Sequence, residues 1–128
     1  MTRGKPREKS EKQIQNEILA MIKAEPNLFA FKASDRVNRG IPDIIGVAKD
    51  YFPSFYATDG CNLIVTRTGA VEKSAGKMFL IEVKRRGGKP TDLQMEMIRR
   101  FTAMGAIAFI AESVDQARQR LKTHGLLG

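Results

Sequence analysis

Two short segments carry acidic and basic side chains at a spacing that could support chemistry. The first is Gly40-Ile41-Pro42-Asp43, and the second is Glu82-Val83-Lys84. Asp43 opens an apolar run and the second segment ends another, so both segments are predicted to lie on strands. Two strands that each carry an acid, one of them with a lysine two residues on, form a candidate divalent-metal site with a nearby cation. Such a site suits phosphodiester chemistry.

The second segment closes a strand predicted from Met78 to Lys84. Side chains alternate along a strand, so Leu80, Glu82 and Lys84 share one face. A carboxylate and an ammonium on such an apolar strand cost free energy unless they are paired or bind something. The pattern therefore has two interpretations, a functional site or a solvated ion pair on a strand face.

The composition is that of a single basic domain. The 128 residues include 22 Lys and Arg against 14 Asp and Glu, a formal net charge of +8. This excess favours a polyanionic partner, nucleic acid before an anionic membrane surface, although a merely solvated basic surface explains the charge equally well. Residues 103–111 form the longest nearly apolar stretch, which is far shorter than the roughly 20 residues of a membrane span.

The numbers of cysteine and histidine residues limit the kinds of cross-link and metal site that the protein can have. The single cysteine, Cys61, excludes an internal disulfide and fits a reducing compartment. The charged start of the chain shows no secretory signal, so a cytoplasmic protein is expected. The only histidine, His124, lies near a predicted helix end, where a cation is favourable. Metal sites built on paired histidines and nucleases with a histidine base are therefore disfavoured.

Three helices are predicted by one start signal, a hydroxyl residue with glutamine three positions on. They run from Ser10 to about Glu25, from Thr91 to Met104 and from Ser113 to His124. Strands are predicted at 28–32, from 41 or 43 to 48, at 78–84 and at 106–111. The order α-β-β-β-α-β-α predicts an α/β fold with an antiparallel meander of three strands. The second helix then crosses over to bring the last strand alongside.

Apolar residues recur at helical spacing in the first two predicted helices. The pattern in the second helix predicts a buried face with Gln94 at its edge; the face consists of Leu93, Met97, Phe101 and Met104. In the first helix, Glu17 lies on the flank of the apolar stripe.

Two segments do not fit the scheme of a single domain over residues 11–128. Residues 1–10 carry several cations and no apolar periodicity, which predicts a flexible basic arm that tracks phosphates or a plain disordered terminus. Residues 49–77 are longer than the structureless loops of compact domains, which predicts an insertion with a short strand and turn at 62–69. The insertion is either a small hairpin over the core or a surface that stacks on bases or contacts a second subunit. It holds four clustered aromatics, Tyr51, Phe52, Phe55 and Tyr56.

In their order, these motifs and elements resemble the VRR-NUC family, the virus-type replication-repair nucleases of the PD-(D/E)XK nuclease superfamily. The likeness covers most of residues 10–122 apart from the predicted insertion. It is carried by the Glu17 helix, Arg39-Gly-Ile-Pro-Asp-Ile-Ile-Gly, Phe79-Leu-Ile-Glu-Val-Lys-Arg-Arg-Gly-Gly-Lys, the Gln94 helix and Gly105-Ala-Ile-Ala-Phe-Ile-Ala. The resemblance implies a restriction-endonuclease-like αβββαβ core with a mixed central sheet and flanking helices.

The resemblance also implies roles for individual residues. Asp43 and Glu82 would hold Mg²⁺ or Mn²⁺ together with the main-chain carbonyl of Val83, since hard cations bind oxygen ligands. Lys84 would orient the attacking water or neutralise the developing negative charge. Glu17 would approach the metal from the first helix, directly or through water.

Two of these assignments have a structural alternative. Gln94 is implied to fix the water or a phosphate oxygen, but it is also the third residue of a capping box and could instead return to Thr91. Glu17 could be an ordinary charge on the flank of its helix.

Several cations lie close in sequence to the predicted site. Contacts from such cations to DNA phosphates each add salt dependence to binding. The predicted DNA-binding residues are Arg36, Arg39, Arg85, Arg86 and Lys89.

The sequence thus predicts a metal-dependent DNA endonuclease. The resemblance implies a structure-specific enzyme that cuts Holliday junctions or other branched DNA during replication, recombination or repair in a bacterial or phage-infected cell. A homodimer is expected, because two sites are needed to cut two strands. The alternatives are a non-catalytic nucleic-acid-binding protein on the same fold and a sequence-specific restriction-type nuclease.

Overall fold

The computed structural model describes residues 8–33, 39–49, 51, 64–65, 71–72 and 76–128. Its elements are α1 (Glu11–Lys23), β1 (Leu28–Lys32), β2 (Ile44–Ala48), β3 (Ile64–Val65), β4 (Val71–Glu72), β5 (Lys77–Val83), α3 (Asp92–Ala103), β6 (Ile107–Ala111) and α4 (Val114–Thr123). The basic arm lies outside the described residues up to residue 7, as does most of the segment 49–77. Within that segment, β3 and β4 form an antiparallel pair.

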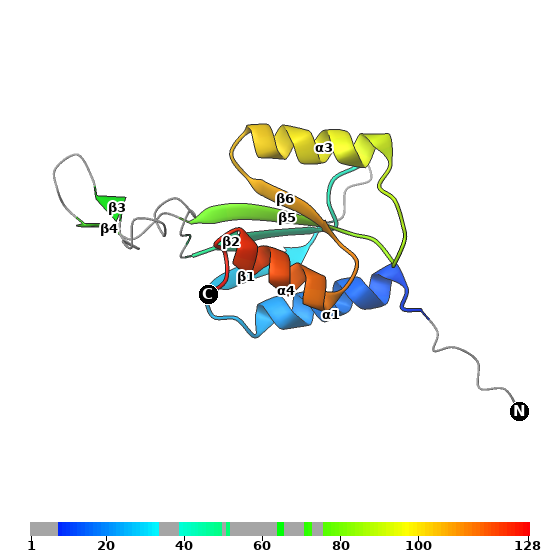
Figure 1. Ribbon diagram of the computed structural model, residues 1–128, viewed down its shortest axis with the longest axis horizontal. Coiled ribbons are helices and arrows are strands. Elements are labelled where there is room, and N and C mark those ends of the chain that lie inside the picture. Colours follow the sequence, from blue (N-terminus) through cyan, green and yellow to red (C-terminus); the bar gives the residue numbers. More distant parts are fainter. Residues whose placement is uncertain (1–7, 34–38, 50, 52–63, 66–70, 73–75) are drawn as a thin grey trace, which may run out of the picture.

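The main sheet has four strands in the order β1-β2-β5-β6 (Figure 1). The first three form an antiparallel meander, and β6 pairs with β5 in parallel after the α3 crossover. A parallel neighbour requires such a crossover, because the chain must return to the same end of the sheet. The predicted αβββαβ core with a mixed sheet is confirmed.

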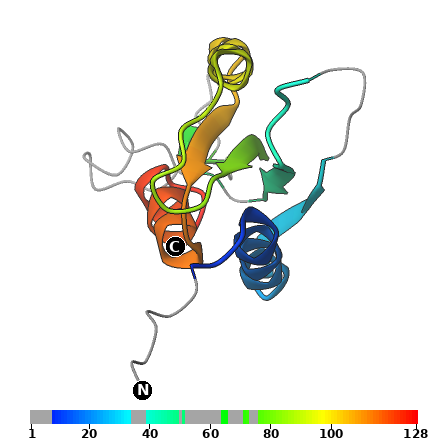
Figure 2. The same ribbon diagram turned by 90° about the vertical axis from the view of Figure 1, so that its right-hand side faces the viewer.

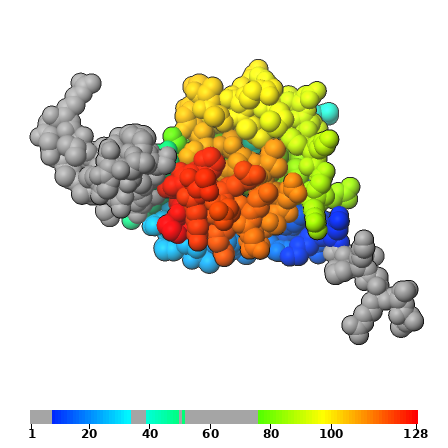
Figure 3. All heavy atoms as spheres, viewed as in Figure 1, coloured from blue at the N-terminus to red at the C-terminus, as the bar shows by residue number. Residues whose placement is uncertain are grey.

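The helices lie on both faces of the sheet. Figure 2 shows α3 on one face and the pair α1 and α4 on the other. In the space-filling view, α3 runs along the top of the molecule with α4 below it (Figure 3). The main core lies between the sheet and α1 with α4, and its fully buried members include Ile18, Ile44, Phe79, Ile81 and Leu121. As a central strand, β5 is buried from Phe79 to Val83 on both faces.

The helix start signals act as predicted. The Ser10 hydroxyl accepts from the Gln13 N–H and the Gln13 side chain accepts from the Ser10 N–H, and Thr91 and Gln94 form the same reciprocal pair. Each box satisfies two backbone donors that the first turn of a helix leaves open. Among the described residues, no helix has the length and apolar character needed to cross a membrane.

The predicted buried face of α3 is wrong. The helix has no buried residue, and Leu93 and Met104 are 47% and 87% exposed. Among the described elements, α3 makes its main contacts with β6, the edge strand of the sheet. A helix above a sheet edge is covered on one side only. Periodicity therefore located the apolar stripe but could not predict how much of it is covered.

Candidate active site

Asp43 directly precedes β2, and Glu82 is the second-last residue of β5. Asp43 lines a hollow together with residues from the start of α1. Ile44 lies opposite Ile81, so the antiparallel register continues to place Asp43 opposite Glu82. The Ala33 N–H donates to the Asp43 carbonyl at 2.7 Å, which extends the pairing of β1 with β2 to this row. Directly opposed residues share a sheet face with Cβ atoms about 5 Å apart. The register therefore brings the two carboxyl groups together.

Glu82 is a buried acid at the centre of the sheet, only 2% exposed. Its Oε1 lies 3.7 Å from Nζ of Lys84, whose side chain is itself only 10% exposed. Among the described residues, Oε2 of Glu82 has no hydrogen-bond partner. A solvated ion pair on a strand face is therefore not what forms here. A buried carboxylate oxygen without a partner is costly, which points to a ligand.

Asp43 is held in place by the backbone of β5. Its Oδ2 accepts a hydrogen bond from the Val83 N–H at 2.8 Å. The backbone N–H that follows Glu82 therefore orients the second acid, and the position of Asp43 depends on the β2–β5 pairing. Such preorganisation is what a metal or catalytic site needs.

Both acids have raised pKa values, chiefly because they are withdrawn from solvent. Burial, followed by the negative charge of Asp43, raises the pKa of Glu82 to about 8, although Lys84 opposes this shift. Burial also raises the pKa of Asp43, against the lowering effect of the Val83 N–H. At neutral pH the pair therefore keeps a proton unless a cation binds between the carboxylates.

A hollow of about 390 Å³ opens on Asp43 at this end of the sheet, and α1 contributes half of its lining. The negative charge of Glu11 is among the causes that raise the pKa of both Asp43 and Glu82. Gln15 lies one turn further along the same side of α1 and is only 6% exposed. The lining residues are Glu11, Lys12, Gln15, Lys32, Asp43 and Val83.

Sequence reasoning missed Glu11 and Gln15. The available signal was their i, i+4 spacing, which places two polar side chains on one side of α1 beside the buried stripe. Glu17 is two residues past Gln15 and thus roughly 200° around the helix.

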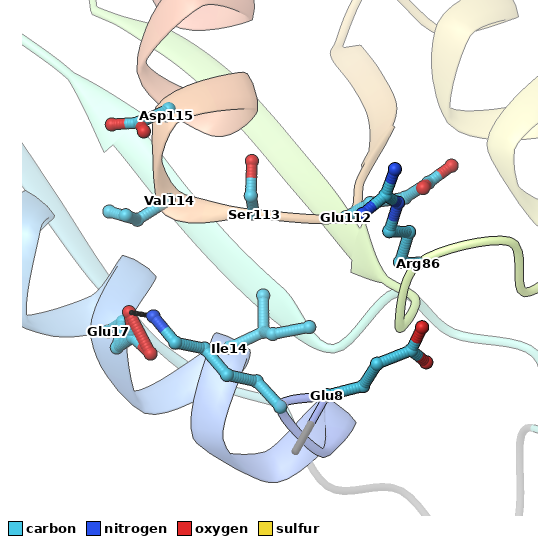
Figure 4. A pocket seen from close by; sticks show the side chains of 9 residues that line it. Glu8, Ile14, Glu17, Arg86, Glu112, Ser113, Val114 and Asp115 are labelled. Atoms are coloured by element: carbon cyan, nitrogen blue, oxygen red, sulfur yellow. Dashed lines mark hydrogen bonds and ion pairs between the residues drawn. The ribbon is translucent and has the colours of Figure 1, made fainter. Parts of the chain in front are cut away.

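The structure places Glu17 away from the two acids. It lines a separate hollow of about 680 Å³ with Arg86, Glu112 and Asp115, and its Oε2 pairs with Nζ of Lys9 at 2.8 Å (Figure 4). The helix periodicity thus separates Glu17 from the hollow that opens on Asp43.

Gln94 adopts its structural alternative. Its Oε1 accepts from the Thr91 N–H at 2.8 Å, and its own N–H donates to Oγ1 of Thr91 at 3.1 Å. The α3 N-terminus lies close to the approach to β2, because a Cβ on Gly40 would come within 2.8 Å of the Leu93 side chain. Gly40 also has φ +87°, so glycine is required there on both counts.

The predicted DNA-binding cations differ in placement. Arg36 lies outside the described residues, whereas Arg39, Arg85, Arg86 and Lys89 are all exposed. Arg85 and Arg86 follow β5 immediately and so lie close to Lys84 in the chain. Exposed cations near the acidic pair can contact phosphates without being held in the site.

The donor set fits a hard divalent cation. Asp43 and the partnerless Oε2 of Glu82 offer carboxylate oxygens, and such a cation would stabilise the buried negative charge whose desolvation raises both pKa values. In the described part of the chain, no group of three or more Asp, Glu, His or Cys is gathered as a metal site. Two carboxylates, a main-chain carbonyl and waters form the kind of incomplete protein shell that suits Mg²⁺.

Two solved structures resemble this chain in fold. No family sequence model and no curated protein matches the chain. Among solved structures, a "VRR_NUC domain protein" is similar with a TM-score of 0.63 and 18% identity over 95% of this chain and 93% of that one. A structure named "VRR_NUC domain" is similar with a TM-score of 0.56 and 19% identity over 91% of this chain and 98% of that one.

The chain has the VRR_NUC fold. The likeness spans nearly the whole length of both partners, so it concerns the fold of the whole chain. The structural comparison thus supports the fold that the sequence resemblance implied.

Proposed function

We propose that this chain is a metal-dependent DNA endonuclease of the VRR-NUC type. The observation that carries the proposal is the pairing of half-buried Asp43 with buried Glu82, with Nζ of Lys84 at 3.7 Å from Oε1 of Glu82, at one end of a VRR_NUC-fold sheet. A protein that only binds nucleic acid gains nothing from holding two acids together where phosphate must approach, because both would repel it.

The proposed cofactor is Mg²⁺ or Mn²⁺, held by Asp43, Glu82 and the main-chain carbonyl of Val83. When bound, the ion lowers the pKa of a water and supplies positive charge at the reacting phosphate. Glu11 extends the acidic set from α1, in the place that the sequence resemblance assigned to Glu17. Gln15 lies beside it as a buried polar group able to hold a water.

Lys84 supplies the fixed positive charge of the site. Its ammonium is nearly buried and lies beside Glu82, so it stays close to the reacting group without rearrangement. Such a preorganised cation stabilises the negative charge that develops on phosphate oxygens in the transition state. Lys84 can also orient the attacking water by donating a hydrogen bond to it.

Exposed cations supply the affinity for DNA. Arg39, Arg85, Arg86 and Lys89 are the described members of this set. Phosphate contacts of this kind account for most non-specific binding and make it salt-dependent. We place this activity in the cytoplasm of a bacterial or phage-infected cell, in replication, recombination or repair.

Cleavage should require a divalent cation and favour branched DNA. The test incubates the protein with matched linear, flap, splayed and four-way DNA in Mg²⁺, Mn²⁺ or EDTA, with end-labelled strands resolved on a denaturing gel. The expected result is cutting near branch points with either metal and no cutting in EDTA. Binding without cleavage of any substrate in either metal would instead identify a non-catalytic binding protein.

The proposed enzyme acts as a homodimer. Two strands of a branched substrate need two sites, and a symmetric dimer supplies them from one kind of chain. Sedimentation at micromolar concentrations should show a dimer, alone or on four-way DNA. A monomer under all these conditions, together with cleavage of single strands only, would remove the junction-cutting version of the proposal.

A further inference from the structure

The sheet face that carries Glu82 also exposes an unusual set of apolar side chains. Phe29 and Phe31 on β1 are 68% and 53% exposed, and Val47 and Met78 are 46% and 38% exposed. The register places Phe29 opposite Val47 and Val47 opposite Met78, so these three side chains form one row across three strands. Phe31 lies two residues further along β1 on the same face. Adjacent exposed apolar residues of this size mark a contact surface.

This surface borders the candidate active site. Phe31 lies opposite Ile45, and the next row along the strands is Ala33, Asp43 and Glu82. A step of two residues along a strand and one strand across corresponds to about 8 Å between Cα atoms of Phe31 and Asp43. A molecule lying on Phe31 is therefore within reach of the acid pair.

The rings of Phe29 and Phe31 do not stack on each other. Their centroids are 6.2 Å apart and their planes are inclined at 55°, so neither ring covers the face of the other. Aromatic side chains on an open sheet surface can take up unpaired bases by stacking, which is how four-stranded sheets bind single-stranded nucleic acid.

The positive charges around this surface favour a polyanion as its ligand. Lys49 is exposed just past the end of β2 that lies away from Asp43. Its N–H donates to the Asn27 carbonyl at 2.7 Å, which continues the β1–β2 pairing, so the alternation of side chains puts Lys49 on the same face as Val47. Lys84 lies at the opposite end. Cations at both ends of an aromatic surface complement a phosphate backbone that crosses it. A second copy of a chain with net charge +8 would bring like charge against this surface.

We infer that Phe29 and Phe31 form a stacking subsite for unpaired bases of the DNA strand whose phosphate lies at Asp43 and Glu82. The inference rests on the proposed function and names its substrate class, a strand that is single-stranded next to the cut. Bases inside an intact duplex are already stacked on their neighbours, so they cannot use the two rings without unpairing.

The test measures binding without metal, so its outcome is separate from cleavage. Fluorescence anisotropy in EDTA compares oligothymidylate with blunt duplex for the wild type and for two double variants. Phe29→Leu with Phe31→Leu keeps the apolar surface but removes the π-faces, whereas Phe29→Tyr with Phe31→Tyr keeps both. Met104→Leu, at an exposed apolar position on α3, is the matched control.

The leucine variant should bind oligothymidylate about tenfold or more weakly, while the tyrosine variant and the control bind as the wild type does. Its affinity for duplex should stay within about twofold, because phosphate contacts dominate there. Equal oligothymidylate affinity for the leucine variant and the wild type overturns the inference. A serine pair at the same positions that turns a wild-type dimer into a monomer, with oligonucleotide affinity per subunit unchanged, assigns the face to a second copy and also overturns it.

Discussion

Replacing Glu82 with glutamine should lower the rate of phosphodiester cleavage by at least about a thousandfold while the protein stays folded. Glutamine cannot supply a charged oxygen to a divalent cation, although it matches the protonated acid in size and hydrogen bonding. The pKa of about 8 means that the apoprotein already holds Glu82 in this neutral form at pH 7. Single-turnover cleavage at saturating metal measures the loss, and a thermal melt in EDTA checks the fold.

Asp43→Asn and Lys84→Ala should be comparably inactive for different reasons. The first removes a ligand charge, and the second removes the fixed cation beside Glu82. Most DNA affinity should remain in all three variants, because exposed cations carry it. A Lys84→Ala protein that cuts at the wild-type rate would show that the active site is misassigned.

Two matched substitutions on α1 test which of its acidic residues belongs to the site. Glu11→Gln and Glu17→Gln make the same chemical change in the same helix, but only Glu11 lines the hollow that opens on Asp43. The Glu11 variant should lose activity or metal affinity, and the Glu17 variant should lose only its exposed contact with Lys9. Loss of activity in the Glu17 variant alone would restore the assignment implied by the sequence resemblance.

The metal-free protein should become less stable as pH rises from 5 to 8.5. Glu82 has a folded-state pKa of about 8 against an ordinary value of 4.5. The folded state therefore binds its proton more tightly, and the resulting stability is present at low pH and lost as pH rises through the folded-state pKa. The loss is on the order of 4 kcal/mol. Denaturant titration in EDTA at several pH values measures it.

Glu82→Gln is the control for this prediction, because it keeps position 82 uncharged at every pH. Its free energy of unfolding should show a smaller decline over the same range, and the difference between the two proteins isolates Glu82. Parallel curves would contradict the raised pKa. Adding Mg²⁺ or Mn²⁺ should stabilise the wild type more at pH 8.5 than at pH 6, because the ion displaces the proton held by the acids.

Local residue patterns were sufficient to predict the helices and strands and the chemical character of the site. Hydroxyl and glutamine pairs located the helix starts at Ser10 and Thr91, and the strand at 28–32 was predicted with its observed bounds. Alternation along β5 placed Glu82 and Lys84 on one face, where the structure shows them as a buried pair. These features depend on neighbours within a few residues, so the order of residue types is sufficient to predict them.

Which distant groups share the site depends on how the helices and strands pack together. The β2–β5 register sets Asp43 opposite Glu82, and the rotation of α1 turns Glu11 and Gln15, rather than Glu17, toward the hollow that opens on Asp43. The position of α3 above the edge strand β6 leaves Met104 exposed. Phe29 and Phe31 are exposed on β1, the strand at the opposite edge of the sheet. Sequence periodicity shows which side of an element is apolar, but what covers that side depends on the packing of elements far apart in the chain.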